Sequence, residues 1–232
     1  MTMSNIRQEE FVLTLASSSP QRQRILQELG IVFSSVTSDV EEVMLPDAED
    51  TVLTNAKLKV LEVAARPHTA QESVILGADT VLAGNNGVRG KPESYETAIR
   101  YLIELSDTEI TAWTGVAVFS PTTDRGVVLT EHAVLRFNNF TIEAAEWYAQ
   151  TGEPMVRAGA LGTSLLGEIF IKEIQGAYSC VVGLPKCSTL LACSDNESLG
   201  DYRLNLPQSV LDMIGRRWNG KIVRFSGNGQ WL

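Results

Sequence analysis

The chain has 232 residues, of which 44% are hydrophobic and 20% are charged, and its formal net charge is −9. This length and composition are typical of a globular protein with one main core, and they exclude a fibrous, coiled-coil or disordered protein. The acidic balance disfavours a general nucleic-acid binder, which needs a basic face, although a small phosphorylated ligand requires only a few well-placed cations.

The sequence shows no targeting or membrane segment. Residues 1–10 are polar and lack the apolar segment of a secretory signal, and the most apolar stretches, such as 11–16, are much shorter than a membrane span. We therefore expect a soluble, cytoplasmic protein with no membrane partner.

The cysteines and histidines limit the kind of metal site that the chain can form. The three cysteines are odd in number and form no Cys-X-X-Cys pair, which argues against a disulfide framework or a zinc site and fits a reducing compartment. The two histidines, His68 and His132, cannot supply a histidine-rich metal centre. Any metal would therefore be a hard cation held by carboxylates.

Apolar periodicity, turn residues and helix caps predict alternating strands and helices. In the first half we expect strands at 11–16, 31–37 and 73–76, and helices at 20–29, 51–66 and 93–105. In the second half we expect an antiparallel pair at 109–119 and 127–137, a helix at 141–151, a strand at 168–174, and a helix at 179–192 broken at 183–185. Because hairpins interrupt the alternation, these elements predict an α/β fold with a mixed sheet and flanking helices.

The last part of the chain differs in character from the rest. A short helix at 207–218 and a terminal segment at 221–232 follow Asp195. We expect one domain over residues 1–194 and a C-terminal extension, 195–232, that packs on its core.

Four segments carry candidate chemistry, and each also has a simpler interpretation. The hydroxyl-rich start of a helix at 17–24 suits phosphate, but serines cap many helices. The acidic loop 39–42 suits a divalent cation, but charge runs are usually solvated. Asp79 lies at the end of an apolar strand, where a carboxylate can orient water or bind metal, but an aspartate that only forms a turn is equally expected there. Lys91 lies in a Gly-Lys-Pro loop that is not a Walker motif, yet it can reach a phosphate.

Taken in order, these segments resemble the Maf family, whose members are nucleotide pyrophosphatases first known as inhibitors of septum formation. The similarity extends from about residue 13 to 191 and includes LASSSPQR at 15–22, the acidic loop 39–42, GADT at 77–80, GKP at 90–92, TGV at 114–116, GA at 159–160, GAYS at 176–179 and VVGLP at 181–185. The resemblance implies a fold like that of the inosine-triphosphate pyrophosphatases, with two lobes around a cleft. It also implies hydrolysis of a nucleoside triphosphate to the monophosphate and pyrophosphate with Mg²⁺ or Mn²⁺, and a homodimer, which is frequent in the family.

The resemblance also assigns roles to individual residues. It implies that Asp79 is the catalytic base and that Glu42 and Asp79 are the metal ligands. The residues that it implies for phosphate binding are Ser17, Arg22, Lys59 and Lys91. Lys59 is placed through the helix segment 59–64, and Lys57 lies only two positions away.

The specificity positions depart from the family pattern. The branch that hydrolyses dTTP and UTP usually has arginine, and the branch that acts on methylated GTP has tryptophan, where this chain has Gln21. Thr80 matches the dTTP/UTP branch, whereas Arg157, Leu161 and Ser164 replace the lysine, tyrosine and glutamine of the family. We take Gln21, Thr80 and Ser164 as candidate specificity residues, and dTTP, UTP or a modified nucleotide as the candidate substrates.

Two other classes of function compete with an enzyme. One is a nucleotide-binding regulator, associated with cell division, that has weak or no turnover, and the other is a structural protein that interacts through its C-terminal extension. The enzyme is favoured by the retained Asp79, Glu42, Arg22 and Lys91, because a protein that only binds nucleotide would not need the base. Nucleotide sanitation and control of division are both associations of the family.

Overall fold

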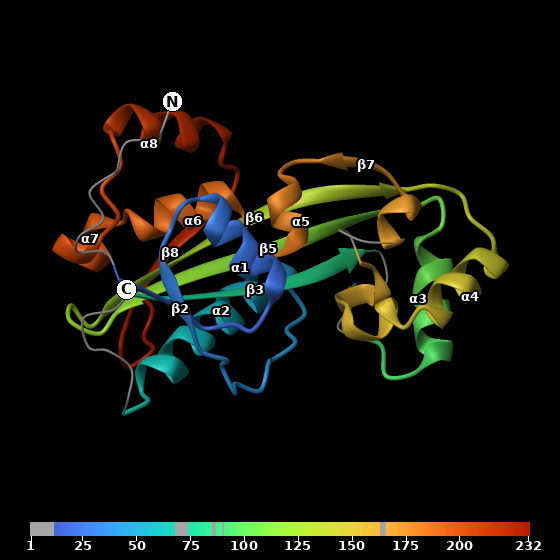
Figure 1. Cartoon of the computed structure of the whole chain (residues 1–232), viewed down its shortest axis with the longest axis horizontal. Coiled ribbons are helices and arrows are strands. Elements are labelled where there is room, and N and C mark those ends of the chain that lie inside the picture. The colour runs from blue at the N-terminus through green and yellow to red at the C-terminus, as the bar shows by residue number, and fades with distance from the viewer. Residues whose placement is uncertain (1–11, 68–73, 85–86, 90, 163–165) are drawn as a thin grey trace.

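The computed structural model describes residues 12–67, 74–84, 87–89, 91–162 and 166–232. Within these ranges one mixed sheet contains a path of strands in the order β2-β1-β3-β5-β6-β7, to which β4 is added beside β3 and β8 beside β6 (Figure 1). The strands are β1 (Leu13–Leu15), β2 (Phe33–Ser35), β3 (Val74–Gly84), β4 (Gly87–Arg89), β5 (Glu109–Ser120), β6 (Arg125–Phe137), β7 (Ile171–Gln175) and β8 (Ile222–Ser226). The predicted α/β fold with a mixed sheet is confirmed.

Helices flank this sheet, as predicted. They are α1 (Pro20–Glu28), α2 (Ala48–Ala64), α3 (Tyr95–Leu105), α4 (Ile142–Gln150), α5 (Tyr178–Val182), α6 (Lys186–Cys193), α7 (Asn196–Leu199) and α8 (Gln208–Arg217). Short 3-10 helices are η1 (Glu153–Val156), η2 (Ala158–Ala160), η3 (Leu166–Phe170) and η4 (Gly200–Tyr202). Among the described residues, no helix combines the length and the apolar character that crossing a bilayer requires.

The pairing of β1 leaves part of an edge of β3 open. β1 runs parallel to both β2 and β3, but it pairs with β3 only at Val74–Leu76. β4 pairs with the same strand only at Leu82–Gly84. Between these points no described strand pairs with 77–81 on this side, although β5 pairs along the other side. The fold therefore leaves the edge of β3 at residues 77–81 unpaired with any described strand on the side of β1.

Helix α2 packs very closely on one face of the sheet. An added Cβ at Gly77 would lie 2.9 Å from Val60 Cγ1, and one at Gly115 would lie 2.5 Å from the carbonyl oxygen of Val52. These two glycines lack the side chains that would push the helix away. Successive residues of a strand face opposite sides of a sheet, so Asp79 faces α2, as Gly77 does, whereas Thr80 faces the other side.

Some predicted boundaries were wrong, most importantly at Asp79. The strand predicted at 73–76 continues as β3 to Gly84, so Asp79 lies within a strand and is not a turn residue. The apolar run ends at Leu76, but the close approach of α2 requires Gly77, and pairing with β5 holds the following residues extended. The strand predicted at 168–174 begins as the 3-10 helix η3 and becomes extended only at Ile171.

Buried side chains gather towards the two ends of the long strands. Among the clusters of buried side chains, one joins the early part of β3 to α1 and α6, and another joins the late part of β3 to α3, α4, α5 and η2. In Figure 1, α3 and α4 accordingly lie at one end of the molecule and α1 and α6 lie towards the other. This arrangement agrees with the predicted two lobes.

The C-terminal extension contributes to the sheet and to the core. β8 pairs antiparallel with β6 at 125–129, and this pairing covers an edge that would otherwise be open. Phe225 is fully buried and stacks on Phe119 with ring centroids 5.9 Å apart. Its ring covers Gly126, where an added Cβ would lie 2.3 Å from Phe225 Cζ.

We predict that Phe225→Ala lowers the free energy of unfolding by about 3–5 kcal/mol, because it empties a fully buried site. Ile222→Ala is the matched control on the same strand, since Ile222 is 43% exposed, and it should cost less than about 1 kcal/mol. Urea unfolding measures both variants. Equal, small losses would contradict an extension that forms part of the core.

A second prediction concerns Glu131 on β6, whose side chain accepts a hydrogen bond from Ser188 Oγ at 2.7 Å. Burial raises the pKa of Glu131 above 4.5 despite this bond. The folded protein therefore binds a proton that the unfolded chain releases, so the free energy of unfolding falls as pH rises above about 4.5 through the raised pKa. Glu131→Gln should remove this loss, so that it stabilises the protein more at pH 7 than at pH 4.5 in urea unfolding. An effect independent of pH would contradict the assignment.

Candidate active site

A cavity of about 830 Å³ lies along the open edge of β3. Its walls come from the start of α1, the loop before α2, one face of α2, β3, and the segment from η1 to α5. Eight of the nine residues predicted for the site line this cavity, namely Ser17, Gln21, Arg22, Glu42, Lys59, Asp79, Thr80 and Lys91. The ninth, Ser164, lies outside the described residues.

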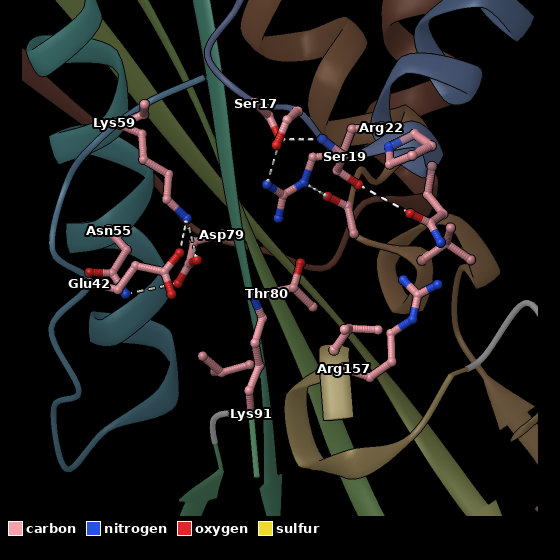
Figure 2. A pocket seen from close by; sticks show the side chains of 18 of the residues that line it. Ser17, Ser19, Arg22, Glu42, Asn55, Lys59, Asp79, Thr80, Lys91 and Arg157 are labelled. Atoms are coloured by element: carbon pink, nitrogen blue, oxygen red, sulfur yellow. Dashed lines mark hydrogen bonds and ion pairs between the residues drawn. The ribbon is translucent and has the colours of Figure 1, made fainter. Parts of the chain in front are cut away.

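At one side of the cavity an ammonium group links two carboxylates (Figure 2). Lys59 Nζ lies 2.7 Å from Asp79 Oδ1 and 2.6 Å from Glu42 Oε1, and it also donates to the carbonyl oxygen of Ala78 at 3.4 Å. Asp79 and Lys59 are buried, with side chains 6% and 9% exposed, whereas the side chain of Glu42 is 59% exposed. Two carboxylates thus converge at the boundary between the core and the cavity.

Asn55, which the sequence analysis did not single out, completes this group. Its Nδ2 donates to Asp79 Oδ2 at 2.9 Å and to the carbonyl oxygen of Val43 at 3.0 Å, and its Oδ1 accepts from the backbone N–H of Val43 at 2.9 Å. Asn55 therefore orients Asp79 and fixes the loop that carries Glu42. The detectable signal is that Asn55 lies one helical turn before Lys59, on the same face of a largely apolar helix.

The structure distinguishes Lys59 from Lys57. Two positions along a helix turn a side chain towards a different face, and Lys57 Nζ donates to the carbonyl oxygen of Gly229 at 2.8 Å. The same ammonium lies 3.6 Å from the ring centroid of Trp231. Lys57 thus holds the C-terminal extension, and Lys59 is the one of the two that faces the cavity.

Arg22 and Ser17 form the wall contributed by β1 and α1. Arg22 Nη1 donates to Ser17 Oγ at 3.3 Å, and Nε donates to the carbonyl oxygen of Gly183 at 2.9 Å. Gly183 has φ +105°, a conformation that favours glycine, and it directs this carbonyl back towards α1. Burial lowers the pKa of Arg22, and the charges of Asp79 and Glu42 oppose that shift.

Thr80 lies on the opposite face of β3 from Asp79. Its Oγ1 is 2.9 Å from Thr114 Oγ1, which donates to the carbonyl oxygen of Cys180 at 2.8 Å. These bonds fasten α5 to the sheet. Gln21, in the first turn of α1, lies beside Arg157, and the exposed Lys91 lies at the border of the cavity.

The acidic loop does not act as one unit. Glu42 points to Lys59, whereas Asp39 pairs with Arg66 at 3.0 Å. Within the described ranges no group of three or more His, Cys, Asp or Glu side chains is placed to hold a metal ion. Glu42 and Asp79, the two carboxylates expected to bind metal, are both paired with Lys59.

Comparison with known proteins gives consistent matches over most of the chain. The family model for Maf-like proteins matches residues 12–195. A dTTP/UTP pyrophosphatase of Vibrio parahaemolyticus is 39% identical over 180 residues, which are 76% of this chain and 93% of that protein. Proteins of the same name from Alkaliphilus metalliredigens and Desulforamulus reducens are 38% and 35% identical, over 75% of this chain and 91% and 90% of their own lengths.

We predict that Asn55→Leu lowers the free energy of unfolding by about 2–4 kcal/mol, because it removes the partner of the buried Asp79 Oδ2 and both side-chain bonds to the backbone of Val43. Thr54→Leu, at a half-buried neighbouring position, is the control and should change stability by less than about 1 kcal/mol. Thermal or urea unfolding measures both. Equal effects of the two substitutions would show that Asn55 does not hold the loop.

Proposed function

This chain belongs to the family of Maf-like proteins, and from that premise we propose that its cavity hydrolyses a nucleoside triphosphate to the nucleoside monophosphate and pyrophosphate. The observation that carries the proposal is the group of Asp79, Glu42 and Lys59, with Arg22 facing the same cavity. A carboxylate beside cations is what attack of water on a polyanion requires.

We assign binding of the triphosphate to the cations and hydroxyls of the cavity. Arg22, Lys59 and Lys91 supply positive charge, and Ser17 supplies a hydroxyl. The N-terminus of α1 adds its partial positive charge, which suits a phosphate group. This charge matters locally, because the chain as a whole carries a net charge of −9 and repels a polyanion.

The same proposal assigns the metal to Glu42 and Asp79. Their carboxylates would hold Mg²⁺ or Mn²⁺ together with phosphate oxygens of the substrate. When bound, the cation would neutralise negative charge on the triphosphate during the reaction.

Asp79 is the residue that we assign as the base. Asn55 and Lys59 hold one oxygen each, which fixes the direction of the carboxylate and leaves lone pairs free to accept a proton. A water oxygen bonds to the α-phosphorus and transfers a proton to Asp79, while the bond from that phosphorus to the bridging oxygen breaks. Pyrophosphate leaves with the electron pair of that bond, and the cations around it stabilise its charge.

The substrates that we propose are dTTP and UTP, in line with the names of the similar proteins. Thr80 supports this choice, since it matches the branch of the family that acts on these nucleotides. Gln21 and Ser164 are the other two residues that we assign to specificity.

From the family we also propose that the protein is cytoplasmic and that it forms a homodimer. The three cysteines support the location, because they are free thiols and fit a reducing compartment. Burial raises the pKa of Cys180 to about 12, which leaves that thiol unreactive. Nucleotide sanitation and an association with septum formation are the biological roles that membership suggests.

The test is release of pyrophosphate from canonical and modified nucleoside triphosphates with Mg²⁺ or Mn²⁺, with UTP and dTTP expected as substrates. We predict that Asp79→Asn lowers kcat by about 10²–10⁴-fold, because the base is lost, while the affinity for nucleotide stays within a few-fold. Normal hydrolysis by this variant would exclude Asp79 as the base. Tight binding by the wild-type protein without turnover of any nucleotide would contradict the enzyme.

Lys59 and Lys57 form a matched pair of controls for this experiment. Lys59→Met should lower kcat/KM strongly, because it removes a cation from the cavity, whereas Lys57→Met should lower stability and leave hydrolysis nearly unchanged. Equal losses of activity would show that stability of α2, and not the charge of Lys59, limits the reaction.

A further inference from the structure

Gln21 and Arg157 meet at the end of the cavity away from the carboxylates. One orientation of the Gln21 amide gives hydrogen-bond partners to both its oxygen and its nitrogen. In that orientation Oε1 accepts from Arg157 Nη1 at 2.8 Å and from Nη2 at 2.9 Å, and Nε2 donates to Ser19 Oγ at 3.3 Å. Figure 2 shows Arg157 and Asp79 on opposite sides of the view, with Thr80 between them. One neutral amide therefore holds a guanidinium group by two bonds.

The backbone on both sides of this contact is constrained. Gln21 lies in the first turn of α1, where Ser19 is the N-cap. Arg157 lies between η1 and η2, and it is followed by Gly159 and Ala160 with φ of 61° and 63°. Gly159 lies against Leu82, since an added Cβ would lie 2.7 Å from Leu82 Cδ1. Neither partner is therefore a side chain on a long free loop.

The donors of Arg157 are only partly used. An arginine has five N–H donors and no acceptor, and Gln21 engages one hydrogen on each terminal nitrogen. Arg157 Nε is buried and makes no hydrogen bond within the described part of the chain. Two hydrogens of the terminal nitrogens remain, and Arg157 is one of the residues that line the cavity.

The surroundings of this end are apolar. Leu82, Leu161 and Val181 line the cavity here and are only 5%, 4% and 7% exposed. Such walls suit the flat face of an aromatic ring better than a phosphate. Lys59, one of the cations assigned to phosphate, lies on the opposite side of the view from Arg157 (Figure 2).

We propose that Arg157, positioned by Gln21, recognises the carbonyl oxygen at C4 of a uracil or thymine base. A group that only donates selects the carbonyl of uracil or thymine, because the amino group of cytosine would direct its own N–H groups at the guanidinium. The proposal rests on the proposed function, since it names the residue pair that selects the base. Gln21 is a positioning residue here, because it acts on the base through Arg157.

The experiment compares UTP with CTP, which differ at this edge of the base. Arg157→Gln should lower kcat/KM for UTP by about 10- to 100-fold and change CTP by less than about 3-fold, since one charged hydrogen bond is lost only with UTP. Gln21→Leu should raise KM for UTP by about 3- to 10-fold and leave kcat within 2-fold, because Arg157 remains but is no longer held. Arg24→Gln and Gln23→Leu, on the same helix outside the cavity, are the matched controls. Neither should change the ratio of kcat/KM for UTP to that for CTP.

The double variant Gln21→Leu/Arg157→Gln identifies the route of the effect. It should be no worse than Arg157→Gln alone, because a positioning residue has no effect once the residue that it positions is gone. Additive losses would overturn the role of Gln21. Equal losses with UTP and CTP would assign Arg157 to phosphate or sugar and overturn the proposal.

Binding of UTP and CTP measured by titration calorimetry separates this proposal from the proposed function. If the wild-type protein bound UTP more tightly than CTP without hydrolysing either, and Arg157→Gln removed that preference, hydrolysis would fail and base recognition would stand. If the wild-type protein hydrolysed UTP and the variant kept the wild-type preference, the enzyme would stand and base recognition would fail.

Discussion

The buried ion pair of Lys59 with Asp79 is the constraint on which the arrangement of the cavity depends. Removing both charges from water costs more than their attraction returns unless further hydrogen bonds stabilise them. Asn55, Glu42 and the carbonyl oxygen of Ala78 supply those bonds. The same bonds orient the carboxylate and carry the loop of Glu42 to the border of the cavity. The residues that stabilise the buried ion pair are therefore also the residues that orient the carboxylate towards the cavity.

The strand order explains why this ion pair faces a cavity at all. A longer β1 would pair with β3 beyond Leu76 and close its edge, but β1 ends at Leu15, and the chain turns into α1. Gly77 and Gly115 let α2 approach the sheet, so that a lysine on the helix reaches an aspartate in the strand. Backbone pairing and the absence of two side chains thus prepare a site that no single motif contains.

At the opposite end of the cavity, a neutral amide and not a carboxylate holds the cation. Gln21 and Arg157, which belong to separate segments of the chain, contact each other. A second arginine in place of Gln21 would set two guanidinium groups together, whereas an amide gives Arg157 an acceptor. The C-terminal extension lies away from this contact, where β8 covers β6 and Lys57 binds the terminal segment.

The sequence by itself determined the mixed α/β class, the family and eight residues that line the cavity, because periodicity and short motifs are local properties. Asp79 was correctly placed in the cavity but wrongly placed at the end of a strand. Pairing with β5 extends that strand, and a local pattern does not show such pairing. The tertiary structure alone decided between Lys57 and Lys59 and showed Asn55 beside Asp79. It alone joined Gln21 to Arg157, because residues so far apart in sequence come together only through packing of the whole chain.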